Sequence, residues 1–202
     1  MIKGVFGLPR SGKTTYLAKL AKQAIKKGRK VYTNFYCKGC YTLDFDSLGL
    51  YDYSDCLLLI DEISLFCDCR SFKNYSDNHK YFFALHAHYN CDIVYCSQSY
   101  MDCDKKIRNV TDSLYQITPW FFGTSRVRPI QKQFIIEKGS ISEFYEVKGF
   151  GSLVFRKRYY SMFDSFERKQ LPPNNEKLWN DIPGKTEKKQ YKPPCVITTK
   201  NK

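Results

Sequence analysis

Long apolar stretches are missing from this chain of 202 residues. No apolar run approaches the ~18 residues that a membrane-spanning helix requires, so we do not expect an integral membrane protein. We expect no cleavable targeting segment either, because the N-terminus enters a strand-like pattern at once, Ile2-Lys-Gly-Val-Phe6. The sequence also contains no internal repeat. We therefore expect a protein that stays in the cytoplasm, where it is made.

Hydrophobic residues make up 43% of the chain and aromatic residues 16%, which is typical of a folded protein. A chain of this length can bury one sizeable core, with one appendage, but not two catalytic domains. The 33 Lys and Arg outnumber the 20 Asp and Glu, which gives a formal charge of +13. This excess favours a polyanionic partner, either nucleic acid or an acidic membrane surface. The alternative is a basic surface with no single partner.

The nine cysteines are odd in number, so they cannot all pair within the chain. The missing signal and the nucleotide motif described below both argue for a reducing compartment and free thiols. Most of them, such as Cys56 and Cys96 inside apolar segments, are expected to be small core residues. A tetrahedral zinc site formed by two cysteine pairs is the alternative, although the Cys-x-Cys spacing of one pair is shorter than is usual for zinc ligands. Its ligands would be Cys37, Cys40, Cys67 and Cys69.

The first 118 residues alternate between strand-like and helix-like segments. Strands are predicted at Ile2–Phe6, Lys30–Asn34, Cys56–Ile60, Asp92–Ser97 and Leu114–Thr118. Helices are predicted at Lys13–Lys27, capped by Gly28, at Tyr81–His88 and at Asp104–Val110, and a tight hairpin at Tyr36–Thr42. The fully apolar segment Cys56–Ile60 suits a central parallel strand buried on both faces. The alternation predicts an α/β fold, a mainly parallel sheet flanked by helices.

The pattern changes after residue 118. Strand-like segments at Gln131–Glu137, Ile141–Val147 and Ser152–Arg158, separated by glycine-containing turns, predict a small antiparallel β meander appended to the parallel sheet. From about Leu171 the chain is rich in Pro, Asn and Lys. We expect one folded domain over 1–168, with its parallel core at about 1–118 and the meander at about 130–160. A basic, mostly disordered tail would cover 169–202.

Between the first strand and the first helix the chain reads Gly7-Leu-Pro-Arg-Ser-Gly-Lys-Thr14, which satisfies the P-loop pattern. Glycines let backbone amides turn toward the β-phosphate, and the helix N-terminus adds positive potential. Lys13 would reach the β- and γ-phosphates of ATP, Thr14 would ligate Mg²⁺, and Thr15 would assist at the α-phosphate. The alternative is a chance glycine-rich turn, at odds of about one in a hundred. The expected nucleotide-binding residues are Gly7, Leu8, Pro9, Arg10, Ser11, Gly12, Lys13, Thr14 and Thr15.

Two carboxylates follow the apolar segment Leu57-Leu-Leu-Ile60. Asp61 is expected to hold Mg²⁺, as a Walker B aspartate does, and Glu62 to polarise a water toward the γ-phosphate. The alternative is that the two acids merely begin a loop. Gln98 ends the next apolar strand and could sense the γ-phosphate, or be a turn residue with no role.

Catalysis of phosphoryl transfer also needs a cation that stabilises transition-state charge, often from a neighbouring subunit. Arg108 is the first candidate and Arg70 the second, although each could be an ordinary surface arginine.

A basic and aromatic stretch near residue 155 could bind single-stranded DNA, with rings stacked on bases and cations on phosphates. Its candidate residues are Arg156, Lys157, Arg158 and Tyr159. The alternative is an edge strand with a solvated charged face.

In their order along the chain these motifs resemble the zonula occludens toxin-like (Zot) ATPase domain of filamentous phages, within the FtsK–HerA group of DNA pumps. The resemblance covers about residues 1–168. It rests on the P-loop, Gly28-Arg-Lys-Val-Tyr-Thr-Asn34, Leu58-Leu-Ile-Asp-Glu62, His88-Tyr-Asn-Cys-Asp-Ile-Val-Tyr-Cys-Ser-Gln98, Asp104-Lys-Lys-Ile-Arg108 and Tyr159-Tyr-Ser-Met-Phe-Asp-Ser-Phe166.

The resemblance implies an ATPase that works on phage DNA during assembly, as a homo-oligomeric ring, with a hexamer expected. Asp61, Glu62, Gln98 and Arg108 would then have the roles given above. Two departures stand out. Ala87-His88 replaces an Arg-His pair that is common in the family, and no membrane span follows the domain. An export role at the membrane would therefore need a membrane-anchored partner protein.

The leading hypothesis is thus an ATP-hydrolysing motor that drives phage DNA packaging, assembly or extrusion. A nucleoside kinase of the thymidine type is the second hypothesis, since it shares the chain length, the early P-loop, an acid pair and cysteine pairs. Here the cysteine pairs precede or directly follow the acids instead of lying late in the chain. The third hypothesis is a non-catalytic, nucleotide-gated scaffold, which Glu62 argues against.

Overall fold

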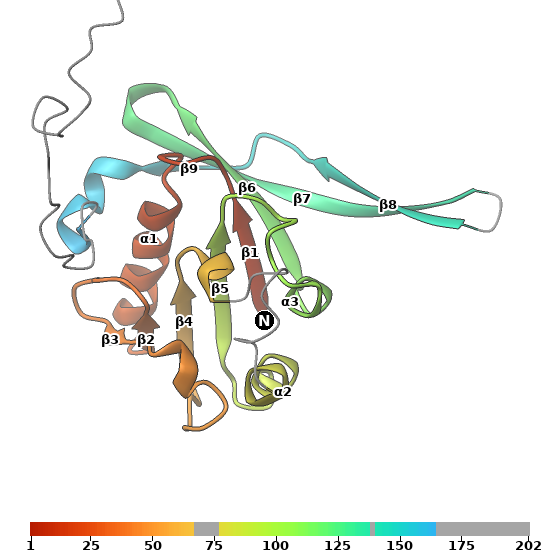
Figure 1. The fold of residues 1–202 in the computed structure, drawn as a ribbon. Helices are drawn as coiled ribbons and strands as arrows, with labels where there is room; N and C mark the ends of the chain where they lie inside the picture. Colours follow the sequence, from red (N-terminus) through yellow and green to blue (C-terminus); the bar gives the residue numbers. More distant parts are fainter. Residues whose placement is uncertain (67–76, 138–139, 165–202) are drawn as a thin grey trace, which may run out of the picture. The chain divides into compact units, whose positions relative to one another are not determined.

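One nine-stranded sheet organises the protein (Figure 1). The structure, a computed structural model, describes residues 1–66, 77–137 and 140–164, with only the backbone described over 134–143. In the sheet the strands follow the order β3-β2-β4-β5-β1-β6-β7-β8, and β9 pairs with β7. The strands that pair in parallel are β1 (Ile2–Phe6), β2 (Lys30–Thr33), β3 (Tyr41–Thr42), β4 (Cys56–Ile60), β5 (Asp92–Ser97) and β6 (Ser113–Trp120). The predicted α/β class is confirmed.

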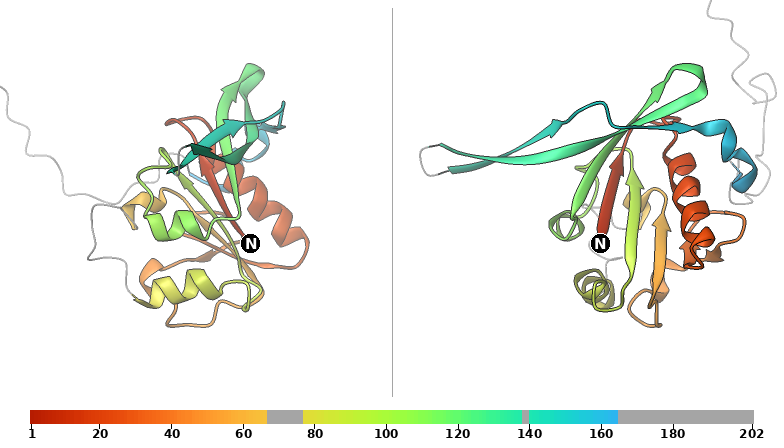
Figure 2. Two further views of the ribbon diagram at one scale, coloured as in Figure 1. Left: turned by 90° about the vertical axis from the view of Figure 1, so that its right-hand side faces the viewer. Right: turned by 180° about the vertical axis from the view of Figure 1, so that it is seen from behind.

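Helices cover both faces of the parallel strands, as Figures 1 and 2 show. They are α1 (Lys13–Lys26), α2 (Asp77–Leu85) and α3 (Lys105–Asn109). Along β4, Leu57 and Leu59 belong to the core cluster that contains Leu17 of α1. Leu58 belongs to the cluster that contains Phe82 of α2. Because successive side chains point to opposite faces, a central strand between two helical layers must be apolar throughout, as β4 is.

The first helix begins and ends where the sequence indicates. Gly12, with φ 100°, precedes Lys13. At the other end Gly28 has φ 73°, and its amide donates to the carbonyl of Ile25. The left-handed conformation at Gly28 is the usual helix stop, so the predicted C-terminal cap is confirmed.

The predicted antiparallel appendage is confirmed, but its strands do not pair in the order of a meander. The strand β7 (Thr124–Glu137) starts seven residues before the predicted Gln131 and pairs antiparallel with β6. Its second half, from Ile130, pairs with β8 (Ser140–Val147), whereas its first four residues pair with β9 (Ser152–Phe155). The long strand β7 therefore pairs with both β8 and β9. The β7–β8 hairpin extends away from the parallel strands (Figure 1).

Three further local predictions need correction. The segment Tyr36–Thr42 forms no hairpin, because Tyr41 and Thr42 pair in parallel with β2 after a turn at 37–40. The helix predicted at Tyr81–His88 is α2, which begins earlier, at Asp77, and ends at Leu85. The strand predicted at Ser152–Arg158 ends at Phe155 and continues as a 3₁₀ turn. The tail predicted at 169–202 lies outside the described residues.

Asp92, at the start of β5, ties the N-terminus to the sheet. Its Oδ1 lies 2.9 Å from the Met1 ammonium, and its Oδ2 accepts a hydrogen bond from Arg29. Partial burial raises the pKa of Asp92, but the hydrogen bonds and charges of Arg29 and the N-terminus outweigh it and hold the pKa below the usual value. The stability that this lowered pKa provides is present above the ordinary carboxyl pKa and lost as the pH falls through the folded-state pKa.

We therefore expect Arg29→Ala to lower the free energy of unfolding at pH 7 by about 0.5–1 kcal/mol, a small effect because the pair is partly exposed. The difference from the wild type should shrink at about pH 3, where the unfolded carboxyl is protonated. Urea denaturation at both pH values measures it. A difference of equal size at both would contradict the account.

Candidate nucleotide-binding site

The loop between β1 and α1 lies at the carboxyl edge of the parallel strands, and two of its positions require glycine. A Cβ on Gly7 would lie 2.4 Å from the Ile117 carbonyl oxygen. Gly12 has φ 100°, and a Cβ there would lie 2.3 Å from Ser125 Oγ. That hydroxyl donates to the Ser11 carbonyl at 2.6 Å. The loop is thus held by hydrogen bonding and close packing against β6 and β7.

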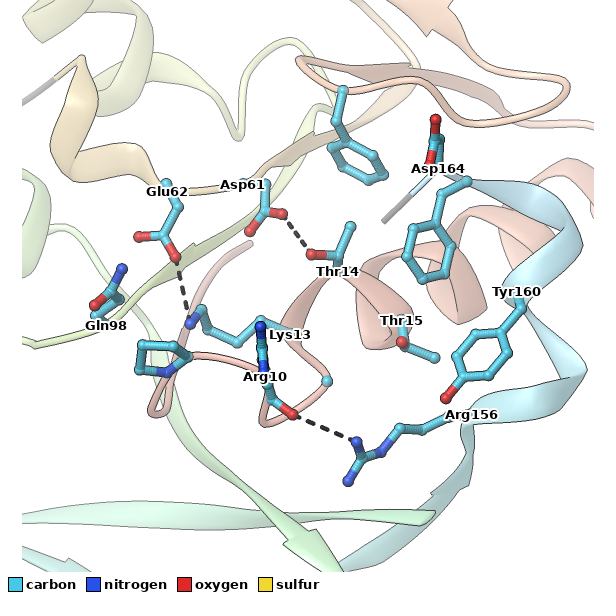
Figure 3. Close-up of a pocket in the computed structure, with 14 residues that line it drawn as sticks. Arg10, Lys13, Thr14, Thr15, Asp61, Glu62, Gln98, Arg156, Tyr160 and Asp164 are labelled. Atoms are coloured by element: carbon cyan, nitrogen blue, oxygen red, sulfur yellow. Dashed lines mark hydrogen bonds and ion pairs between the residues drawn. The ribbon is translucent and has the colours of Figure 1, made fainter. Parts of the chain in front are cut away.

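Lys13 is folded into this loop. Its Nζ donates to the carbonyl oxygen of Gly7 at 2.9 Å and to that of Leu8 at 3.4 Å. The same ammonium lies 3.3 Å from Glu62 Oε1 (Figure 3). Only 6% of the residue is exposed, so the charge is largely desolvated and is held where the P-loop pattern places it.

Asp61 and Thr14 meet beside the loop. The Thr14 hydroxyl donates to Asp61 Oδ2 at 2.6 Å. The other carboxylate oxygen, Oδ1, is buried and has no hydrogen-bond partner among the residues that the structure describes. Burial raises the pKa of Asp61, while the Thr14 hydrogen bond and the Lys13 charge act in the opposite direction. A hydroxyl and a carboxylate with an unsatisfied oxygen form the hard-oxygen donor set that Mg²⁺ prefers, so these two residues fit that ion.

Glu62 leaves the end of β4 in a left-handed conformation. Its φ is 48° and its ψ 60°. Such a backbone is unfavourable for a residue with a Cβ, by about 1–3 kcal/mol, and strain of this kind gathers at functional sites. The turn directs the carboxylate to Lys13, and 28% of the side chain remains accessible (Figure 3). An acid at this place can accept a proton from a water in the pocket.

Gln98 reaches the same pocket because β5 lies between β1 and β4 in the sheet. The residue after the end of β5 therefore emerges between the P-loop and the two acids (Figure 3). The pocket has a volume of about 470 Å³ and is lined by Pro9, Arg10, Gly12, Lys13, Thr14, Thr15, Phe35, Asp61, Glu62, Gln98, Arg156, Tyr160, Phe163 and Asp164. Of the expected nucleotide-binding residues Gly7, Leu8 and Ser11 do not line it directly.

Arg156 is placed differently from the prediction. Its guanidinium donates to the Thr124 carbonyl, from Nε at 3.2 Å and Nη2 at 2.9 Å, and to the Arg10 carbonyl from Nη1 at 3.3 Å. Tyr159 packs against the α1 core cluster, with Lys22 Nζ 5.8 Å from its ring centroid. Neither side chain stands on an exposed strand face, and DNA binding by these two residues stays a prediction. Lys157 and Arg158 are exposed on the 3₁₀ turn.

Asn34, at the end of β2, is a site residue to which the sequence assigned no role. Its Nδ2 donates to the Asp61 carbonyl oxygen at 2.8 Å, and its Oδ1 accepts from the Asp61 amide at 2.7 Å. This pair of hydrogen bonds fixes the backbone that carries Asp61. The only sequence signal for this role of Asn34 was a side-chain amide directly after β2, the strand next to β4.

We expect Asn34→Ala to lower the free energy of unfolding by about 1–3 kcal/mol, because it leaves backbone polar groups of Asp61 without partners. Asn109→Ala, at the exposed end of α3, is the matched control and should change stability by less than about 0.5 kcal/mol. Urea denaturation measures both. Equal stability of the two variants would show that the Asn34 contacts do not hold the strand end.

Arg108 is not part of the pocket. Its guanidinium carbon lies 5.1 Å from the centroid of the Tyr100 ring, and its Nη1 contacts the Met101 sulfur at 3.3 Å. A contribution to a neighbouring subunit's pocket stays a prediction. Arg70 lies outside the described residues.

Of the proposed zinc ligands, Cys37 is buried and Cys40 partly buried, and the two form a turn. A hydrogen bond from Cys37 lowers the pKa of Cys40 and raises that of Cys37. Cys67 and Cys69 lie outside the described residues. Within the described ranges no three His, Cys, Asp or Glu side chains gather as metal ligands would.

A glycine-bounded loop with a buried lysine, a hydroxyl next to a strand-end aspartate, and an accessible glutamate are together the parts that the P-loop pattern requires of a nucleotide-binding site. A family model described as zonular occludens toxin (Zot) matches residues 41–120. The matched segment begins after the P-loop and contains Asp61, Glu62, Gln98 and Arg108. The resemblance to Zot-like P-loop ATPases is thereby confirmed. No match was found among curated proteins.

The solved structures similar to this chain include the following three. The N-terminal domain of zonular occludens toxin from Neisseria meningitidis has 17% identity and a TM-score of 0.48, covering 81% of this chain and 98% of that one. The genome packaging NTPase B204 from Sulfolobus turreted icosahedral virus 2, in complex with ATP-gammaS, has 11% identity and a TM-score of 0.49, with coverages of 70% and 95%. The flagellar accessory protein FlaH from Methanocaldococcus jannaschii has 13% identity and a TM-score of 0.45, with coverages of 71% and 88%.

In the part of the chain that the structure describes, no helix combines the length and apolar character needed to span a membrane.

Proposed function

We propose that the protein is an ATP-hydrolysing motor of the Zot-like type that drives phage DNA packaging, assembly or extrusion. One observation carries the proposal. Lys13 and Thr14 at the start of α1, Asp61 and Glu62 after β4, and Gln98 after β5 line one pocket beside the P-loop. Binding alone needs the lysine and the loop, whereas an accessible carboxylate at the γ-phosphate end also suits hydrolysis.

The ion pair between Lys13 and Glu62 suggests how binding prepares the reaction. A triphosphate competes with Glu62 and the loop carbonyls for the Lys13 ammonium. Once released, the Glu62 carboxylate is free to accept a proton from a water that attacks the γ-phosphorus, while the bond to the bridging oxygen breaks and ADP leaves. Mg²⁺ held by Thr14 and Asp61 would neutralise phosphate charge. Gln98 would orient the water or contact the γ-phosphate.

Assay of phosphate release from Mg·ATP, with and without single-stranded DNA, tests this proposal. We expect turnover that rises when DNA is added, and a ring of several copies, a hexamer by resemblance, when the mass is measured with an ATP analogue and DNA. ATP binding without turnover at any DNA or protein concentration would contradict the motor and favour a scaffold. Phosphorylated thymidine as the product would favour the kinase.

The DNA contact is proposed to lie at the turn between β6 and β7. Phe121 is 69% exposed and Phe122 98% exposed. Next to them the Arg126 guanidinium carbon lies 4.7 Å from the Trp120 ring centroid and 4.4 Å from the Phe150 centroid. Exposed rings around an arginine suit stacking on unpaired bases, together with the net charge of +13. Ser125, which follows this turn, donates to the P-loop carbonyl of Ser11, so the turn is linked to the nucleotide site.

We expect the double variant Phe121→Ala/Phe122→Ala to raise the DNA concentration for half-maximal stimulation at least about 30-fold, because each of the two lost stacks weakens binding by about 1–3 kcal/mol. Basal turnover without DNA should stay unchanged. Tyr81→Ala, which removes a ring that is 69% exposed on α2, is the control and should leave both values unchanged. An unchanged DNA dependence in the double variant would place the contact elsewhere.

A further inference from the structure

The pocket has two ends of different chemistry. Lys13, Asp61, Glu62 and Gln98 supply charge and polar atoms at one end. Tyr160 lies toward the other end (Figure 3), the Phe163 ring packs against it, and Phe35 also lines the pocket. Figure 3 shows Thr15 and Tyr160 on the side of Thr14 that faces away from Glu62 and Gln98. A nucleoside triphosphate has the same arrangement, with its negative charge at one end and its base at the other.

The aromatic end is assembled from two distant segments that are joined through their backbones. Cys37 forms an antiparallel bridge with Phe163, and the Lys38 amide donates to the Met162 carbonyl at 2.7 Å. The Thr33 hydroxyl donates to the Phe35 carbonyl at 2.7 Å, which fixes the chain just after β2. The backbone segments that carry Phe35 and Phe163 are therefore held by the fold and need little reordering to receive a ligand.

Tyr160 presents the accessible ring of this group. Half of the residue is exposed, whereas Phe163 is 7% exposed and belongs to the α1 core cluster. The two rings are T-shaped, with centroids 6.4 Å apart and planes at 74°. The buried ring thus supports the exposed one, whose remaining surface borders the pocket.

Arg156 joins this wall to the P-loop. It precedes Tyr160 by four residues, and its guanidinium donates to the carbonyl oxygens of Thr124 and Arg10. The wall that carries the aromatic residues is therefore hydrogen-bonded to the loop that would carry the phosphates. The volume of about 470 Å³ lies in the usual range for a small-molecule site, about 300–1,000 Å³.

We propose that Phe35, Tyr160 and Phe163 form the subsite for the nucleobase, and that it takes the base of a purine nucleoside triphosphate by stacking on Tyr160. The inference rests on the proposed function, because it concerns the same ligand. Every base can stack through the face of its ring. A purine, which has two rings, therefore contacts more of the Tyr160 ring than a single-ring pyrimidine does. Specificity for the purine class then comes from ring area.

Equilibrium binding of ATP, CTP and inorganic tripolyphosphate, each with Mg²⁺, tests the subsite in the full chain. The wild type should bind ATP more tightly than CTP, and CTP more tightly than tripolyphosphate. Tyr160→Ala should weaken ATP binding about tenfold and leave the affinity for tripolyphosphate within about twofold. Tyr160→Phe keeps the ring and should bind ATP as the wild type does, and Tyr81→Ala should change nothing.

The outcomes separate the two levels of the proposal. If Tyr160→Ala weakens ATP and tripolyphosphate equally, or weakens neither, the base does not stack on Tyr160 and the subsite is wrong, while the triphosphate site stands. The same holds if the wild type binds tripolyphosphate as tightly as ATP. Equal affinity for ATP and CTP would overturn the preference for purines. If the wild type binds none of the three, the proposed function itself fails and the subsite fails with it.

Discussion

Replacing Glu62 by glutamine should stop ATP turnover and leave ATP bound. The two side chains have nearly the same shape, but the amide cannot take a proton from the attacking water, a role that contributes about 10²–10⁴-fold to rates in enzymes. Affinity for ATP should not fall, because Glu62 competes with the phosphates for the Lys13 ammonium, from which its Oε1 lies 3.3 Å. Single-turnover phosphate release and equilibrium ATP binding measure the two effects separately.

Glu146→Gln is the matched control for this variant. Glu146 is on β8, is not among the residues that line the pocket, and pairs with Lys148 at 2.7 Å. Its replacement should leave turnover unchanged. If Glu62→Gln turned over as fast as the wild type, another group would activate the water, and the strained backbone at Glu62 would need a different explanation.

Lys13→Ala should remove turnover and nucleotide affinity together. The ammonium is buried among carbonyl oxygens and opposite Glu62, so its loss leaves that carboxylate without its cation and removes a positive charge that would contact the phosphates. Loss of one partner of a buried, hydrogen-bonded charge pair weakens binding by about 2–5 kcal/mol, or about 30-fold to several thousandfold. Phosphate release over a range of ATP concentrations measures the effect.

Two comparisons make the result with Lys13 specific. Lys13→Met keeps the apolar stem and should fail in the same way, which separates the loss of charge from a loss of packing. Lys26→Ala removes an exposed lysine at the other end of the same helix and should behave as the wild type. If Lys13→Met and Lys26→Ala lost the same amount of turnover and nucleotide affinity, the cause would be the protein's net charge and not the position of Lys13 in the pocket.

The parallel strands and the first helix could be predicted because local patterns determine them. The strand β4 is apolar throughout, and β5 is apolar between its end residues Asp92 and Ser97, since helices cover both of their faces, and this leaves a clear sequence signal. Lys13, Asp61, Glu62 and Gln98 each follow a strand or lie in the P-loop next to β1. Because the carboxyl ends of parallel strands lie at one edge of the sheet, the positions of these residues in the sequence were enough to predict that they lie close together.

The remaining parts of the fold depend on long-range pairing. The strand β7 begins Thr124-Ser-Arg-Val-Arg-Pro129, where charges and a proline favour a loop, and only the neighbouring strands make it a strand. Arg156 and Tyr160 lie more than 140 residues after the P-loop, and no periodicity connects the two segments. Their place in the pocket follows from β9, whose pairing with β7 carries the chain back to the P-loop.

The central claim is that this loop and its lysine grip a nucleoside triphosphate, and calorimetric titration with Mg²⁺ and a non-hydrolysable ATP analogue tests it most directly. The wild type should bind one analogue per chain, and Lys13→Ala should bind it at least about 30-fold more weakly. Identical affinities for the two proteins, or no binding to the wild type, would contradict the account.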